Sequence, residues 1–165
     1  MTTRLGTIPP SRREAYTAER VEAFSARCRE HGLSVTPQRR AIMRVLLASE
    51  AHPRAEDVFD AVRAEHPTIS LATVHRTLET LCQIGEARKV TALHHSARYD
   101  GNVRPHHHLV CVGCRRIVDV EAPEFDEILA AKKRLGEFEV LGCSVEIHVR
   151  CRACRDTQHS PEIHS

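Results

Sequence analysis

The chain has 165 residues, of which 41% are hydrophobic and 28% charged, enough for one ordinary domain or two small ones with hydrophobic cores. No apolar run approaches the roughly 18 residues needed to cross a bilayer, and residues 1–16 lack the apolar stretch of a secretory signal. We therefore expect a cytoplasmic protein with a disordered extension over residues 1–16.

The charge is uneven along the chain. Residues 1–100 carry 15 Lys and Arg against 12 Asp and Glu, whereas the remaining 65 residues carry 9 against 10. This distribution fits a partner-binding first half and a different second half.

Residues 17–62 show apolar side chains at helical spacing in three segments. The first predicted helix covers residues 17–31 and ends near Gly32. The second begins at Thr36-Pro37, which supplies a hydroxyl cap and a proline at the first helical position. The third begins near Pro53, places Ala55, Val58, Phe59 and Val62 on one stripe, and stops before Pro67.

A fourth helix is predicted from Ser70, its cap, to Gly85, because apolar residues recur three and four positions apart in LATVHRTLETLCQI. Two short extended runs follow, ARKVTA and ARYD, joined by a polar loop. Helices followed by a hairpin indicate a winged helix-turn-helix domain over residues 17–100.

The fourth helix leaves polar side chains opposite its apolar stripe. Arginine on such a face suits bidentate contact with guanine, and threonine suits phosphates or thymine methyl groups. Solvated surface cations are the alternative interpretation. The candidate DNA contacts are Thr73, His75, Arg76, Thr80, Arg39, Arg40, Arg44, Arg88 and Lys89.

The second half alternates strands with a helix. After a linker at residues 101–105, strands are predicted at 106–112 and 116–120, a helix at 123–135, and a strand with a period of two over 141–149. We expect a small α/β domain over residues 106–155 and a flexible tail at 156–165. The fold class is therefore α+β.

Two C-x2-C pairs, CVGC at 111–114 and CRAC at 151–154, lie in this second half. Each pair can place two thiolates on one ion, so Cys111, Cys114, Cys151 and Cys154 complete a closed tetrahedral zinc site, which is structural. Unligated cysteines or a redox pair are the alternatives. Cys28, Cys82 and Cys143 are interpreted as packing residues.

The sequence HHHLVCVGC also contains a histidine cluster. His106 and His108 leave the same face of a strand and can converge on one ion, whereas His107 points the other way. Asp119, Asp100 and His52 are candidate further ligands. Mixed histidine and carboxylate donors favour Fe(II), Mn(II) or Zn(II). A solvated histidine tract is the alternative.

Enzyme chemistry is disfavoured. The deaminase pattern needs H-x-E ahead of P-C-x-x-C, and the sequence has neither. It also shows no evident general base beside the histidines, no Ser/His/Asp order and no phosphate-binding glycine loop. A zinc-stapled interaction module without a sensor remains the alternative from another class.

From about Ala18 to Cys154 the chain resembles the ferric uptake regulator (Fur) family of bacterial metal-dependent repressors. The matching segments are TPQRRAI, AHPRAEDVFDAV, ISLATVHRTLETL, the ARYD hairpin, HHHLVC-x2-C followed by IVD, and the C-x2-C pair at 151–154. The resemblance implies a winged-helix DNA-binding domain, a C-terminal dimerisation domain, and a homodimer on a double-stranded operator with inverted symmetry.

The resemblance also implies roles for individual positions. The four cysteines match the structural Zn2+ ligands. A regulatory Fe2+ or Mn2+ site bridging the two domains is matched by His52, Asp100, His106, His108 and Asp119. An aspartate as last ligand is typical of the peroxide-responsive (PerR) branch, in which peroxide oxidises an Fe(II)-bound histidine. His52 and His106 occupy the oxidised positions.

The sequence departs from the family pattern in three places. His75 stands where tyrosine is typical, and Arg76 matches the arginine of iron-responsive members, so an iron-responsive or zinc-responsive repressor remains an alternative. Pro105 and Cys143 replace two expected histidines of an accessory metal site, of which His107 and Asp126 occupy the other two positions.

Overall fold

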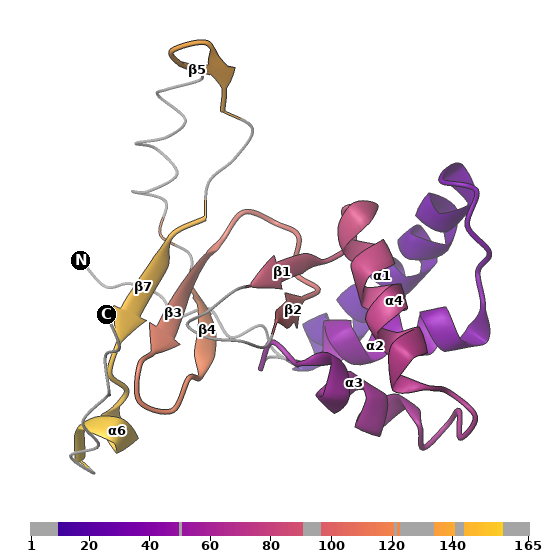
Figure 1. The fold of residues 1–165 in the computed structure, drawn as a ribbon, viewed down its shortest axis with the longest axis horizontal. Coiled ribbons are helices and arrows are strands. Elements are labelled where there is room, and N and C mark those ends of the chain that lie inside the picture. Colours follow the sequence, from indigo (N-terminus) through magenta and orange to yellow (C-terminus); the bar gives the residue numbers. More distant parts are fainter. Residues whose placement is uncertain are drawn as a thin grey trace. The chain divides into compact units, whose positions relative to one another are not determined.

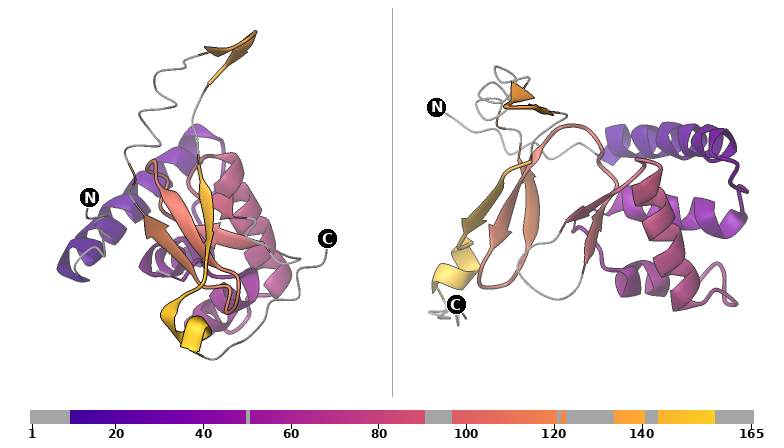
Figure 2. Two further views of the ribbon diagram at one scale, coloured as in Figure 1. Left: turned by 90° about the vertical axis from the view of Figure 1, so that its left-hand side faces the viewer. Right: turned by 45° about the horizontal axis from the view of Figure 1, so that its top comes forward.

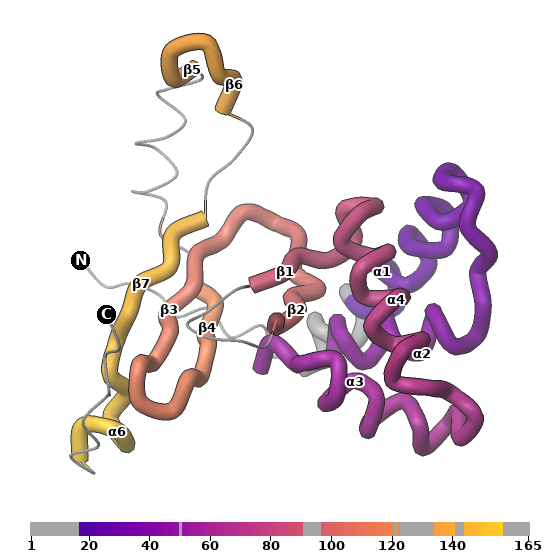
Figure 3. The backbone as a smooth tube through the Cα atoms, viewed as in Figure 1, coloured from indigo at the N-terminus to yellow at the C-terminus, as the bar shows by residue number. Residues whose placement is uncertain are grey.

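The computed structural model describes residues 10–49, 51–90, 97–120, 122, 134–140 and 144–156. They divide into two compact units, with the boundary between Val103 and Arg104. Figures 1 and 3 label the elements of each unit.

The first unit contains four helices followed by a two-stranded hairpin. The helices are α1 (Pro10–Glu30), α2 (Pro37–Ala48), α3 (Ala55–Val62) and α4 (Leu71–Gln83). Strands β1 (Arg88–Val90) and β2 (Arg98–Asp100) pair antiparallel, with Lys89 opposite Tyr99. The tube in Figure 3 follows this order, which is that of a winged helix-turn-helix.

Hydroxyl caps fix the starts of α2 and α4. Thr36 Oγ1 accepts from the Arg39 backbone N at 3.2 Å, and Pro37 occupies the first helical turn. Ser70 Oγ accepts from the Thr73 backbone N at 3.1 Å. Both predicted starts are confirmed, because these side chains satisfy backbone donors that have no partner within the helix.

The predicted boundary of the N-terminal extension is wrong from Pro10 onward. Helix α1 begins at Pro10, not near residue 17, while residues 1–9 lie outside the described residues. The apolar stripe begins only near Val21, but proline suits a first helical turn, and the arginine, glutamate and alanine that follow are strong helix formers. Local propensity therefore begins the helix before the apolar stripe does.

The core of the first unit combines all four helices with β2. Cys28 is buried in it and Cys82 packs against it, as expected for packing residues, whereas Cys143 lies outside the described residues. The most deeply buried side chains include Phe24, Ile42, Met43, Leu46, Val58, Val62, Val74, Leu78, Leu81 and Tyr99.

The second unit is built on a three-stranded sheet. Strand β3 (His107–Cys111) lies between β4 (Ile117–Val120), to which it is antiparallel, and β7 (Glu146–Val149), to which it is parallel, as Figure 2 shows. A hairpin of β5 (Arg134–Leu135) and β6 (Phe138–Glu139) and the short helix α6 (Arg152–Asp156) complete the described elements.

For the second unit, the predicted strand pattern is confirmed, whereas the end of the predicted helix is wrong. The alternation of half-buried and exposed residues predicted for the last strand holds over 145–150. The predicted helix at 123–135 lies outside the described residues except for Arg134 and Leu135, which form β5 instead, because the turn at Gly136 (φ +62°) folds them back on β6. The predicted tail lies outside the described residues beyond Asp156, the end of α6.

Candidate metal centres and nucleic-acid interface

The four cysteines of the two C-x2-C pairs come together in the second unit. One sulfur from each lies within 4.8 Å of the other three, and the Sγ atoms of Cys114 and Cys151 are 3.8 Å apart. Sulfur ligands at about 2.3 Å from a tetrahedral zinc ion lie about 3.8 Å from one another. The cluster therefore fits a closed zinc site, which has no position left for a substrate.

A tight turn shapes the first pair. The Arg115 backbone N donates to Cys111 O at 2.8 Å, and Arg115 itself has φ +60°. A Cβ atom on Gly113 would lie 2.8 Å from Cys154 Sγ, closer than real Cβ atoms approach. Gly113 thus allows the second pair to close on the first, a role that the sequence turn signal did not reveal.

The thiols of the cluster have unequal acidities. Burial raises the pKa of Cys111, but the backbone N–H groups of Cys151, Cys114 and Gly113 donate to its sulfur and bring that pKa down to about 6. The hydrogen bond to Cys151, followed by burial, raises the pKa of Cys154 to about 12. At neutral pH the metal-free cluster therefore holds both thiolate and thiol.

Two histidines and one carboxylate form a second cluster in the same unit. The Nε2 atoms of His106 and His108 are 3.0 Å apart, and Asp119 Oδ1 lies 3.5 Å and 3.7 Å from them. Asp119 is there because β4 places it opposite His108 in the β3–β4 register. The side chains of both histidines are buried.

The spacing of these atoms suits one metal ion. Nitrogen ligands about 2.1 Å from an ion lie about 3.0 Å apart when they subtend a right angle, and about 3.4 Å apart in a tetrahedron. In addition, His106 Nδ1–H donates to Arg104 O at 2.8 Å, which leaves Nε2 with its lone pair toward His108 and Asp119.

His107 serves a different purpose. Its ring is fully buried, and its Nδ1 accepts from the Val145 backbone N at 3.1 Å. The residue therefore joins β3 to the chain that enters β7. Asp126, its predicted companion in an accessory metal site, lies outside the described residues.

The first unit carries the other two predicted ligands, His52 and Asp100. Both are buried, and a ligand atom of one lies within 4.8 Å of a ligand atom of the other. His52 has φ +49°, an uncommon conformation for a residue with a side chain. Arg98 Nη1 donates to the carbonyls of Ala51 and His52 at 3.3 Å and 3.2 Å.

Three predicted DNA contacts line one surface hollow of about 390 Å³ between the start of α2 and α4: Arg39, Thr73 and Arg76. The Thr80 hydroxyl instead donates to Arg76 O at 2.8 Å, which ties it to its own helix. The side chain of His75 is half exposed, and its Nε2 lies 3.8 Å from Glu56 Oε1. Helix α4 thus presents a polar face with Arg76 exposed on it.

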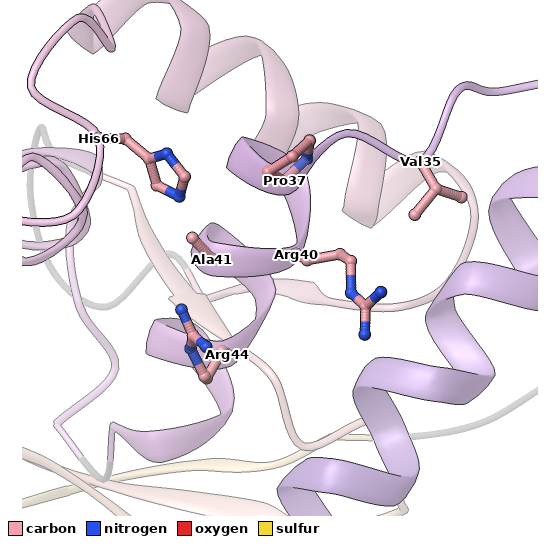
Figure 4. A pocket seen from close by; sticks show the side chains of 6 residues that line it. All are labelled: Val35, Pro37, Arg40, Ala41, Arg44 and His66. Atoms are coloured by element: carbon pink, nitrogen blue, oxygen red, sulfur yellow. The ribbon is translucent and has the colours of Figure 1, made fainter.

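A second hollow lies on another face of α2. It is lined by Val35, Pro37, Arg40, Ala41, Arg44 and His66, whose side chains Figure 4 shows. Arg44 Nη2 lies 2.6 Å from Glu65 Oε2, and Arg40 Nη2 lies 4.0 Å from Glu22 Oε2. Both pairs are exposed, and such pairs contribute at most about 1 kcal/mol, so a phosphate can displace the carboxylates.

The two candidate DNA contacts on the β1–β2 hairpin, Arg88 and Lys89, also have partners within the first unit. Lys89 Nζ lies 2.9 Å from Glu79 Oε1, and Arg88 donates to Val103 O at 2.9 Å. The two side chains leave opposite faces of β1, so they have different surroundings.

Residues 30–148 match the model of the ferric uptake regulator family. The chain belongs to this family. It is 35% identical over 136 residues to the peroxide-responsive repressor PerR of Staphylococcus aureus, and the match covers 82% of this chain and 92% of that protein.

Solved structures agree with the Fur-family assignment. The peroxide stress regulator of Campylobacter jejuni is 30% identical with a TM-score of 0.66, and the match covers 76% of this chain and 95% of that one. The ferric uptake regulator of Helicobacter pylori shares the fold at 19% identity, with a TM-score of 0.73 over 96% of this chain and 99% of that one.

These relatives are regulators, and the present chain is accordingly a metal-responsive transcriptional regulator of the Fur family with α+β architecture. Among the described residues, no helix has both the length and the apolar character required to span a membrane.

Proposed function

We propose that this Fur-family protein is a cytoplasmic, homodimeric repressor that binds an operator with inverted symmetry and senses hydrogen peroxide through an Fe(II)-bound histidine site. The observation that carries the proposal is the His106–His108–Asp119 cluster, with its 3.0 Å spacing between ring nitrogens. Imidazole and carboxylate donors suit Fe(II), an ion that can reduce an oxidant. The 35% identity with a peroxide-responsive repressor supports the same assignment.

The two metal centres have different donors and therefore different roles. The sulfur donors of Cys111, Cys114, Cys151 and Cys154 suit Zn2+, which has no redox chemistry. The regulatory site takes His52 and Asp100 from the first unit and His106, His108 and Asp119 from the second. Its nitrogen and oxygen donors suit Fe2+ or Mn2+.

The protein's contribution is to hold the histidines where oxidation has a consequence. Bound Fe2+ would supply the electrons for peroxide reduction beside the imidazoles. The Arg104 carbonyl fixes the ring of His106, and the φ +49° backbone fixes the direction of His52. Oxidation of either ring removes a ligand.

Because the proposed site takes ligands from both units, metal binding can change the conformation of the protein. Occupancy favours the arrangement in which both ligand sets reach the ion, in proportion to the difference in affinity between arrangements. If that arrangement sets the two α4 helices of a dimer about 34–36 Å apart, metal binding and operator binding become coupled. Losing His52 or His106 as a ligand then weakens DNA binding.

Iron-responsive repression is the second candidate, and Arg76 is the observation that favours it. This exposed residue of α4 matches the arginine of iron-responsive members of the family. The two candidates share the fold and the operator-binding mode, and they differ in whether peroxide abolishes binding.

The test compares Fe(II) with Mn(II). A duplex selected from a random pool by the Mn(II)-loaded protein serves as operator, and its affinity is measured with each metal before and after peroxide. Peroxide sensing predicts a loss confined to the Fe(II) form, together with a 16 Da gain on the peptide that contains His52 or His106. Equal affinity before and after peroxide in the Fe(II) form would leave iron-responsive repression.

A further inference from the structure

Strand β2 has only three residues, Arg98, Tyr99 and Asp100. The first supports one predicted metal ligand of the first unit, and the third is the other predicted ligand. Side chains alternate along a strand, so Arg98 and Asp100 share one face. Asp100 is a predicted ligand. Arg98 holds the backbone of the other one, because its guanidinium donates to the carbonyls of Ala51 and His52.

The middle residue, Tyr99, faces the opposite way and reaches α4. It is buried to 2% exposure, and its hydroxyl donates to Glu79 Oε1 at 3.0 Å. Lys89, its register partner on β1, donates to the same oxygen at 2.9 Å. One carboxylate of α4, the helix that carries the candidate base contacts (the recognition helix), therefore binds both strands of the β1–β2 hairpin (the wing).

The backbone of Tyr99 adds a second tie to the His52 loop. Its N–H donates to Pro53 O at 2.9 Å, one residue beyond His52. Tyr99 is thus bonded at one end to the segment carrying a metal ligand, and at the other end to α4. Glu79 follows Arg76 by three residues, so the two side chains lie close together on the helix surface.

The direction of the Tyr99–Glu79 bond is fixed at neutral pH. Hydrogen bonds from Lys89 and then from Tyr99 hold the pKa of Glu79 below its usual range. The Tyr99 hydroxyl therefore donates to an ionised carboxylate at 3.0 Å, and such charge-assisted bonds are among the stronger ones.

We infer that Tyr99 and Glu79 are positioning residues that transmit the state of His52 and Asp100 to the recognition helix and the wing. This inference rests on the proposed function, in which those two ligands respond to metal. A displacement of β2 reaches α4 through a buried aromatic side chain and a charge-assisted bond. Because Lys89 shares the same carboxylate, the wing moves with the helix.

The test measures how strongly metal and DNA are coupled in the full-length protein. In Tyr99→Phe, which removes only the hydroxyl, Mn(II) affinity without DNA stays within about twofold of the wild type. The ratio of DNA affinities with and without Mn(II) falls about tenfold, the size expected for a hydrogen bond to a charged group. Glu79→Gln keeps an acceptor oxygen but loses the charge, so it retains part of that ratio, whereas Glu79→Leu loses it as Tyr99→Phe does.

Measurements on the wild type and on Tyr99→Phe distinguish a failure of the proposed function from a failure of this inference. If wild-type protein binds the selected duplex equally with and without Mn(II), the proposed function fails, and the inference with it. If the wild type depends on Mn(II) and Tyr99→Phe keeps the full ratio, the inference alone is overturned. A lower melting temperature with an unchanged ratio also overturns it, because that result assigns Tyr99 a purely structural role.

Discussion

The Nε2 atoms of His106 and His108 lie 3.0 Å apart, with their rings nearly perpendicular at 79°. Two imidazoles so arranged direct their ring nitrogens toward a common point. Asp119 Oδ1 lies within 3.7 Å of both. The second unit therefore contains three candidate ligands of one ion, whose roles can be tested separately from that of the neighbouring His107.

His106→Ala should weaken regulatory metal binding and leave the zinc in place. The substitution removes one of the ligand nitrogens of a closely spaced set, whereas the cysteine cluster lies at the other end of β3. Metal analysis after dialysis should find unchanged zinc, and calorimetry should find Mn(II) affinity reduced at least about 10-fold, the loss typical of weakened metal sites. Loss of zinc together with Mn(II) would contradict the separation of the two centres.

His107→Ala should destabilise the fold instead. It opens a cavity and leaves the Val145 N–H without its acceptor, which together cost about 2–4 kcal/mol. Thermal unfolding measures the loss, and His107→Asn should recover part of it because an amide oxygen can replace Nδ1 as acceptor. A variant with wild-type stability would show that the contact to Val145 contributes little.

Asp119→Glu should keep metal-dependent DNA binding but slow the inactivation by peroxide. The longer side chain still brings a carboxylate to His106 and His108, but it changes how that oxygen approaches the ion. The time course of operator release from the Fe(II)-loaded variant after peroxide tests this directly. Wild-type sensitivity in the variant would count against the role assigned to Asp119.

Gly113→Ala should lower zinc retention. The added Cβ would lie 2.8 Å from Cys154 Sγ and 2.9 Å from Cys154 Cβ, so the two C-x2-C pairs must move apart. Zinc transfer to a chromogenic chelator should be faster than in wild type. Val112→Ala, a neighbouring change that removes atoms instead of adding them, is the control and should behave as wild type.

Removal of zinc at pH 7.5 should be accompanied by proton uptake. Cys154, whose pKa is raised to about 12, regains a proton once the metal leaves, whereas Cys111, with a pKa lowered to about 6, stays ionised. Zinc binds thiolates, so its affinity rises with pH up to the pKa of Cys154. Chelator titration calorimetry in two buffers with different ionisation enthalpies counts the protons, and no net uptake by the protein would contradict the assignment.

Local signals made much of the fold predictable. Thr36-Pro37 and Ser70 mark helix starts because a cap depends on residues only three apart. The cysteine cluster was predictable because two C-x2-C pairs restrict the chemistry to few choices. The start of α1 was missed, because residues near Pro10 form helix by propensity and carry no apolar stripe.

Long-range contacts were beyond the sequence. Nothing near Tyr99 indicates that its hydroxyl reaches Glu79, and nothing near Arg98 indicates that it holds the His52 carbonyl, 46 residues away. The φ +49° of His52 also has no sequence signal, since no glycine marks the position. Such features depend on how helices pack, which periodicity alone does not specify.

Anomalous diffraction from crystals of the Mn(II)-loaded protein would locate the regulatory ion and its ligands together. We predict one manganese peak coordinated by His52 and Asp100 from the first unit and by His106, His108 and Asp119 from the second. A peak bound by the second-unit residues alone, with His52 and Asp100 remote from any ion, would contradict this prediction.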